Sequence, residues 1–153
     1  MMKENIFSLE NSTFSLLNLT EEETKLYLNE NKEDFKSLST SEAIDFYARK
    51  WSEKAKFLLL KNDNDELLSL IVFYINVERK ILYITFFVVS RNYRNMGLGH
   101  KMLNYLTDYY SEFFYSIELE VSKENIKAYK FYLKEDFIIK TENKDSYLMT
   151  RKI

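Results

Sequence analysis

Residues 81–99 read ILYITFFVVSRNYRNMGLG, and they carry the clearest indication of the fold. It opens with an apolar run rich in β-branched and aromatic residues, Ile81–Val89, which predicts a strand with both faces covered. A polar loop, Ser90–Met96, leads to Gly-Leu-Gly. A helix is predicted over Leu98–Tyr110, because apolar residues recur on one side of it. The stretch therefore predicts a strand, a loop and a helix in direct succession.

This succession favours an anion site at the loop. The first turn of a helix has unpaired N–H groups and a partial positive charge. Both glycines of the chain, Gly97 and Gly99, lie here, and glycine lets a ligand approach the backbone. Arg94 adds a fork of donors that suits phosphate oxygens. We expect a pyrophosphate against the amides of about residues 95–100, although the motif alone equally fits a tight turn beside a solvated arginine.

Two other nucleotide motifs fit poorly. The G-x-G-x-x-G pattern of a Rossmann-type NAD binder is not completed, because the sequence after Gly99 is His100-Lys101-Met102. The P-loop pattern G-x-x-x-x-G-K-[ST] is absent as well. The loop therefore matches neither of these two nucleotide motifs.

The rest of the chain predicts a mixed sheet with helices on both faces, in the order β-α-α-β-β-β-α-β-α-β-β, an α/β fold. Helices are expected from a Thr20 cap to about Asn31, at Ser41–Lys54, at Leu98–Tyr110, and from a Ser122 cap over Lys123–Lys134. Strands are expected at Thr13–Leu19, Lys56–Lys61, Leu67–Ile75, Ile81–Val89, Tyr115–Val121, Phe137–Lys140 and Ser146–Arg151, with a short one considered at Ile6–Leu9.

Composition narrows the class of protein. The 153 residues suit one domain, 1–153, with one core, since 46% are hydrophobic and 30% charged. A net charge of -2 without a basic stripe argues against nucleic acid as a partner. No signal peptide or membrane span is expected, which favours a cytoplasmic protein. With no cysteine and one histidine, zinc-thiolate sites, histidine-rich metal sites and cysteine nucleophiles are excluded.

A second candidate site follows in residues 117–137, IELEVSKENIKAYKFYLKEDF. Asn125 and Tyr132 are seven residues apart and project from one helix face, with the small Ala128 between them. Taken alone, Tyr132 is more simply one core aromatic among 12 Tyr and 12 Phe. Glu118 and Glu120 alternate with apolar residues on one side of a strand, and this pattern fits a solvated face as well as a functional one.

Together the two segments resemble the GCN5-related N-acetyltransferase (GNAT) superfamily, over about Lys56–Ile153. Residues 89–99 match its acetyl-CoA signature, and L-E-V followed by N-x-x-A-x-x-F-Y resembles the ribosomal-protein alanine N-acetyltransferase branch. Arg91 stands where proline is frequent, and Asn95 and Asp136 stand where glycine is frequent. Neither Arg91 nor Asn95 replaces the signature arginine or a signature glycine. Asp and Asn tolerate the left-handed backbone better than most residues, so the helix C-terminal turn at Asp136 can survive at some cost.

The resemblance implies a role for each matched position. Arg94 and the loop amides would hold the pyrophosphate of acetyl-CoA, and the end of the preceding strand and the face of the later helix would hold pantetheine. The implied cofactor residues are Val88, Val89, Arg94, Asn95, Met96, Gly97, Leu98, Gly99, His100, Asn125 and Ala128. Tyr132 would serve as general acid towards the thioester sulfur, and Glu120 as general base. His100 receives no catalytic role.

The implied activity is acetyl transfer from acetyl-CoA to a primary amine by direct attack, with no metal. The acceptor is a small molecule such as an amino sugar, or a peptide α-amine, expected near Glu21–Lys54 and the connector around Asn76. The alternative is a non-catalytic module that binds acetyl-CoA. Aromatic-rich edges would allow a homodimer.

Overall fold

The computed structural model describes residues 11–34, 38 and 40–153. The chain divides into two compact units. Unit 1 comprises the described residues up to Val72 together with Phe86–Met102, and unit 2 comprises Phe73–Thr85 with Leu103–Ile153. The strand considered at Ile6–Leu9 lies outside the described residues.

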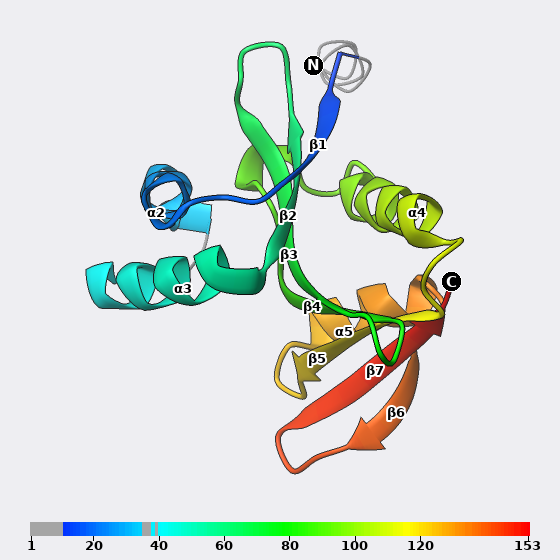
Figure 1. The fold of residues 1–153 in the computed structure, drawn as a ribbon. Coiled ribbons are helices and arrows are strands. Elements are labelled where there is room, and N and C mark those ends of the chain that lie inside the picture. Colours follow the sequence, from blue (N-terminus) through cyan, green and yellow to red (C-terminus); the bar gives the residue numbers. More distant parts are fainter. Residues whose placement is uncertain (1–10, 35–37, 39) are drawn as a thin grey trace. The chain divides into compact units, whose positions relative to one another are not determined.

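The order of helices and strands confirms the predicted α/β fold (Figure 1). The strands are β1 (Thr13–Leu17), β2 (Lys56–Lys61), β3 (Leu67–Asn76), β4 (Ile81–Val89), β5 (Ser116–Ser122), β6 (Ile138–Glu142) and β7 (Ser146–Lys152). The α-helices are α2 (Glu21–Glu30), α3 (Ser41–Lys54), α4 (Leu98–Tyr110) and α5 (Ile126–Lys134). The strands pair in the order β1-β2-β3-β4-β5-β7-β6. The sheet is mixed, because β4 runs parallel to β5 while β7 runs antiparallel to β5.

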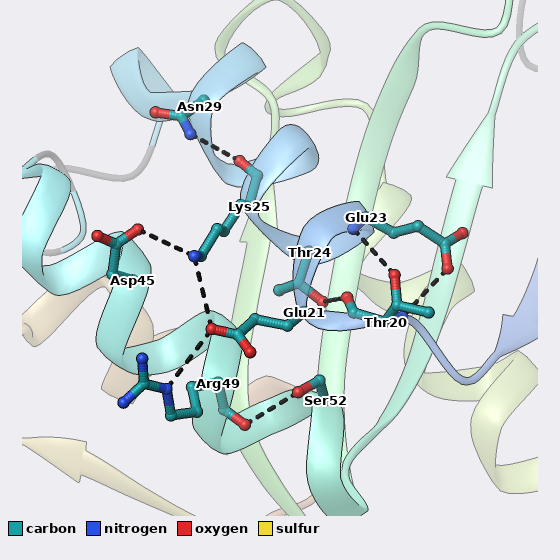
Figure 2. A network of polar contacts seen from close by, with 9 residues as sticks. All are labelled: Thr20, Glu21, Glu23, Thr24, Lys25, Asn29, Asp45, Arg49 and Ser52. Atoms are coloured by element: carbon teal, nitrogen blue, oxygen red, sulfur yellow. Dashed lines mark hydrogen bonds and ion pairs between the residues drawn. The ribbon is translucent and has the colours of Figure 1, made fainter.

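In unit 1, α2 begins where the sequence predicts, at a capping box. The Thr20 hydroxyl accepts from the Glu23 amide at 3.1 Å, and the Glu23 carboxylate accepts from the Thr20 amide at 3.1 Å (Figure 2). Two of the amides at the start of the helix thereby gain acceptors. Thr40 caps α3 through its hydroxyl alone, accepting from the Ala43 amide at 3.1 Å.

Ion pairs join α2 to α3 on their exposed side (Figure 2). The Glu21 carboxylate lies 3.5 Å from Lys25 and 3.5 Å from Arg49, and Lys25 lies 3.6 Å from Asp45. Each exposed pair contributes little by itself. The pairing of the helices depends more on burial, since Ile44, Ala48 and Trp51 of α3 are almost fully buried, as their spacing predicts.

The two apolar strands differ in burial. Strand β3 is buried from Leu67 to Phe73, as expected for a strand covered on both faces. In β4 only Leu82 and Ile84 are buried, and the end of the strand, Phe86–Val89, is partly exposed. The prediction that both faces of β4 are covered is therefore wrong, since only the face bearing Leu82 and Ile84 is buried. Apolar side chains remain accessible just before the loop at Ser90–Met96.

In unit 2, the first half of β4 pairs with β5 from Ile81↔Ser116 to Ile84↔Leu119. Helix α5 begins later than predicted. Its N-cap is Asn125, whose side-chain oxygen accepts from the Ala128 amide at 3.1 Å, and not Ser122. Residues 123–125 form a turn, because the Asn125 amide donates to the Ser122 carbonyl at 3.0 Å. The helix is thus capped by Asn125, which lies closer to its first residue than Ser122, the cap that the sequence predicted.

The end of α5 confirms the interpretation of Asp136. This residue has φ of 66°, in the left-handed region. The Asp136 amide donates to the Leu133 carbonyl at 3.2 Å, and the Phe137 amide donates to the Tyr132 carbonyl at 3.0 Å. These two bonds form a Schellman motif, which usually has glycine at this position. Aspartate keeps the motif at some cost in backbone strain.

Candidate active site

The loop after β4 is anchored at its start by Ser90, a residue of unit 1 that is almost buried. Its amide donates to the Leu68 carbonyl at 2.9 Å, and its hydroxyl donates to the Leu67 carbonyl at 2.7 Å. A short 3-10 helix, Arg91–Tyr93, follows. The loop therefore leaves the strand in a fixed direction.

Arg94 is held in place by the strand that precedes it. Its Nε donates to the Val89 carbonyl at 3.0 Å, while the side chain remains exposed. That bond uses one donor of the guanidinium, and the other donors are on the two terminal nitrogens. A guanidinium oriented this way fits a phosphate group, because part of the entropy of ordering it is already lost.

Two loop residues have a left-handed backbone, Asn95 with φ of 61° and Gly97 with φ of 77°. Asparagine and glycine are the residues that adopt this conformation most readily. A Cβ added at Gly97 would meet no atom within 4 Å. The turn therefore needs glycine for its backbone angle, and the space in front of Gly97 is open to a ligand. Helix α4 begins one residue later, at Leu98, which is buried.

Two backbone carbonyls at the end of β4 already accept hydrogen bonds from side chains of the same unit. The Val88 carbonyl accepts from the Ser69 hydroxyl at 2.8 Å, and the Val89 carbonyl accepts from Arg94. Each carbonyl has two lone pairs, so one more bond can form at each. Contacts between this strand end and pantetheine stay a prediction.

In unit 2, Tyr132 lies on α5 between two aromatic neighbours. Its ring packs edge-on against Phe131 at 5.3 Å and Phe137 at 5.4 Å between centroids. Burial raises the pKa of the Tyr132 phenol well above its ordinary value of about 10. The phenol consequently keeps its proton throughout the neutral range and can donate a hydrogen bond to a leaving group.

The two glutamates of β5 have different environments. Glu120 is exposed, and its Oε1 accepts from the Ser146 hydroxyl at 2.7 Å. Glu118 is only 6% exposed, and its Oε2 lies 2.9 Å from the Lys140 ammonium. An exposed carboxylate with one hydrogen bond can take a proton from an incoming amine. The pattern in the sequence treats the two residues alike, and the structure separates them.

The predicted site residues fall into two groups by unit. Val88, Val89, Arg94, Asn95, Met96, Gly97, Leu98, Gly99 and His100 lie in unit 1, and Glu120, Asn125, Ala128 and Tyr132 lie in unit 2. Within unit 1, His100 is exposed in the first turn of α4. Within unit 2, the Asn125 side-chain oxygen is bound to the Ala128 amide, so the amide nitrogen of Asn125 is the group that could meet a ligand.

The sequence assigned no role to three residues of unit 2 that line a pocket or form an ion pair with a residue of its lining. They are Tyr83, Glu118 and Lys140. The only signal for Glu118 was a second carboxylate in the I-E-L-E-V strand. No sequence pattern pointed to Lys140, because its ion-pair partner, Glu118, lies on another strand.

Two absences hold for the part of the chain that the structure describes. Residues 11–34, 38 and 40–153 contain no group of three or more His, Cys, Asp or Glu side chains placed to hold a metal ion. Within the same ranges, no helix has the length and apolar character needed to cross a membrane.

Comparison with known proteins identifies the family. The model of the acetyltransferase (GNAT) family matches residues 16–137. The chain therefore belongs to this family of enzymes, N-acetyltransferases that take the acetyl group from acetyl-CoA. A search of curated protein sequences found no significant match.

Solved structures share the fold at low sequence identity. PaiA N-acetyltransferase from Thermoplasma acidophilum, in complex with coenzyme A, is 15% identical with a TM-score of 0.70, over 92% of this chain and 99% of that one. The ribosomal-protein-S18-alanine N-acetyltransferase from Escherichia coli is 16% identical with a TM-score of 0.72, over 92% and 94%. A variant of SpeG spermidine N-acetyltransferase from Vibrio cholerae is 14% identical with a TM-score of 0.71, over 94% of each chain.

Proposed function

We propose that this enzyme acetylates a primary amine by direct attack on acetyl-CoA, and that the acceptor is a small molecule or a peptide α-amine. The observation that carries the proposal is the loop after β4. It combines an oriented Arg94, an open space before Gly97 and the start of α4. Neighbours of this fold act on spermidine and on a ribosomal protein, according to their names. Both of these acceptors present an amine.

The loop residues would bind the pyrophosphate of acetyl-CoA. Arg94 supplies charge and donors, and the amides of residues 95–100 supply the partial positive charge of a helix start. The end of β4 at Val88 and Val89 and the α5 face bearing Asn125 and Ala128 would hold pantetheine. These roles rest on the resemblance of the motifs and on the local geometry of each unit.

The chemistry needs a base and an acid. A primary amine with a pKa near 10 is almost fully protonated at pH 7, so it must lose a proton before it attacks. Glu120 takes that proton, directly or through a water molecule. The amine nitrogen then forms a bond to the acetyl carbon and releases a second proton to water, and the carbon–sulfur bond breaks. Tyr132 gives its proton to the departing thiolate, and both residues recover their original state by exchange with water.

Two measurements test this proposal. A melting scan with acetyl-CoA at 100-fold above Kd would show about 2.7 kcal/mol of stabilisation, roughly 5–11 °C in a chain of this size, and NAD serves as the control. Thiol release from acetyl-CoA is then followed with a panel of amines. Tyr132→Phe is expected to lower kcat by about 100-fold or more while the melting shift with acetyl-CoA persists. Binding without any thiol release in the unaltered protein would show a non-catalytic module instead.

A further inference from the structure

Unit 2 contains an open pocket of about 470 Å³ that no step above has used. The end of β3 and the turn that follows it, residues 74–79, form one side, and Ile81, Tyr83 and Glu118 complete the lining. All of these residues belong to one unit. Apolar and aromatic side chains with a few convergent polar groups are typical of a small-molecule site.

The buried carboxylate of the pocket lining is that of Glu118. A carboxylate in an apolar strand is rarely buried unless it has a partner. The partner here is the Lys140 ammonium at 2.9 Å, on a side chain that is 38% exposed against 8% for that of Glu118. The Glu118 carboxylate thus already pairs with one ammonium group, that of Lys140, which does not line the pocket itself.

Lys140 reaches this position through a distortion of the sheet. It lies on β6, and β7 separates β6 from β5. Ile139 pairs with Met149 and Thr141 pairs with Leu148, so Lys140 is the extra residue of a β-bulge. A bulge redirects the side chain of the inserted residue. The ion pair therefore depends on the β-bulge, and Lys140 is the more exposed of its two partners.

The remaining charges around the pocket leave its inner part anionic. Glu78 and Arg79 are both exposed on the turn and offset each other. Tyr83 is the register partner of Glu118 in the parallel pair β4–β5. Burial first, and then the charges of Glu120 and Glu118, raise the pKa of Tyr83. Both β5 carboxylates therefore place negative charge near the phenol.

We propose that this pocket binds a second ammonium group of the acceptor, away from the amine that is acetylated, and that Glu118 makes the enzyme select diamines over monoamines. The inference rests on the proposed function, in which Glu120 receives the proton of the reacting amine. Glu118 and Glu120 are two residues apart on one face of β5, about 6.5 Å along the strand, which suits a short diamine. The incoming ammonium competes with Lys140 for the Glu118 carboxylate, and the Tyr83 ring offers a further cation contact.

Putrescine and butylamine provide a matched test, because they share a four-carbon chain and a reacting primary amine and differ in the second ammonium. The ratio of their kcat/KM values in thiol release isolates that group. We expect putrescine to be favoured about tenfold or more, as for a hydrogen bond to a charged group. Equal values for the two amines in the unaltered enzyme would overturn the inference and leave the proposed function intact.

Two substitutions with opposite expected signs separate binding from structural support. Glu118→Gln is expected to bring the ratio towards one, whereas Lys140→Gln removes the competing ammonium and is expected to increase it. A purely structural ion pair would make both variants lose activity alike with both amines. Glu142→Gln is the control, since it removes an exposed carboxylate of β6 that pairs with Lys123, and the ratio is expected to stay unchanged.

Calorimetric binding of putrescine covers the case in which neither amine is acetylated. We expect putrescine to bind the unaltered protein, to bind Glu118→Gln more weakly and to bind Lys140→Gln more tightly. This result would support the ammonium site even if the catalytic proposal failed. Absence of putrescine binding, or equal binding to the three proteins, would refute the site.

Discussion

Replacing Arg94 by alanine is expected to weaken acetyl-CoA binding strongly and selectively. Hydrogen bonds to a charged group contribute about 1.5–3 kcal/mol, which corresponds to roughly 10–150-fold in Kd. The upper part of that range is expected, because the bond from Nε to the Val89 carbonyl at 3.0 Å already orients the guanidinium. Isothermal titration calorimetry at fixed ionic strength measures the change.

Matched variants and a shortened ligand make this prediction sharp. Arg91→Ala removes the same charge three residues earlier, from a side chain whose Nη2 donates to the Glu33 carbonyl at 3.1 Å, and only a small salt-sensitive loss is expected. Arg94→Lys keeps the charge without the fork of donors and is expected to fall between. Acetyl-pantetheine has no pyrophosphate, so its Kd is expected to be the same for Arg94→Ala and the unaltered protein. Equal losses in Arg94→Ala and Arg91→Ala, or an equal loss with acetyl-pantetheine, would refute the assigned role.

Three further predictions concern stability. Asp136→Gly is expected to raise the free energy of unfolding by about 0.5–1 kcal/mol in urea titrations, because glycine removes the strain of a φ of 66°, and Asp136→Ala is expected to lower it. Thr20→Ala is expected to cost about 1 kcal/mol through loss of the capping box, and Thr20→Ser to cost much less; equal losses would contradict the capping role. Burial raises the folded-state pKa of Tyr132, so its contribution to stability is present below about pH 10 and is lost as pH rises further. Denaturation between pH 9 and 11 is therefore expected to show a shallower decline for Tyr132→Phe than for the unaltered protein, and identical slopes would count against this.

The sequence by itself was sufficient for features that depend on neighbours along the chain. The capping box at Thr20 is one such feature, because the two residues that exchange hydrogen bonds are three apart. The left-handed turns at Gly97 and Asp136 are others, since few residue types adopt positive φ at low cost. The family signature around Arg94 belongs to the same class. Its residues lie in one short segment, so their order in the sequence is also their order in the loop.

Local sequence patterns gave a wrong prediction at two places, the start of α5 and the burial of β4. Ser122 and Asn125 are both good helix caps, and the turn over residues 123–125 decided in favour of Asn125. The apolar run of β4 predicted burial on both faces, yet burial depends on which elements cover a strand, and Phe86–Val89 are partly exposed. Neither outcome is encoded in the period of the hydrophobic residues.

The sharpest contrast is between Glu118 and Glu120. The sequence determined that both lie on the same face of one strand, because side chains alternate with a period of two. Only the tertiary structure decided that Glu118 is buried against Lys140 while Glu120 is exposed beside Ser146. The partners come from β6 and from the start of β7, and the bulge that directs Lys140 arises from the pairing of β6 with β7. Contacts between strands distant in sequence set the burial and charge of a side chain, and no local pattern carries that information.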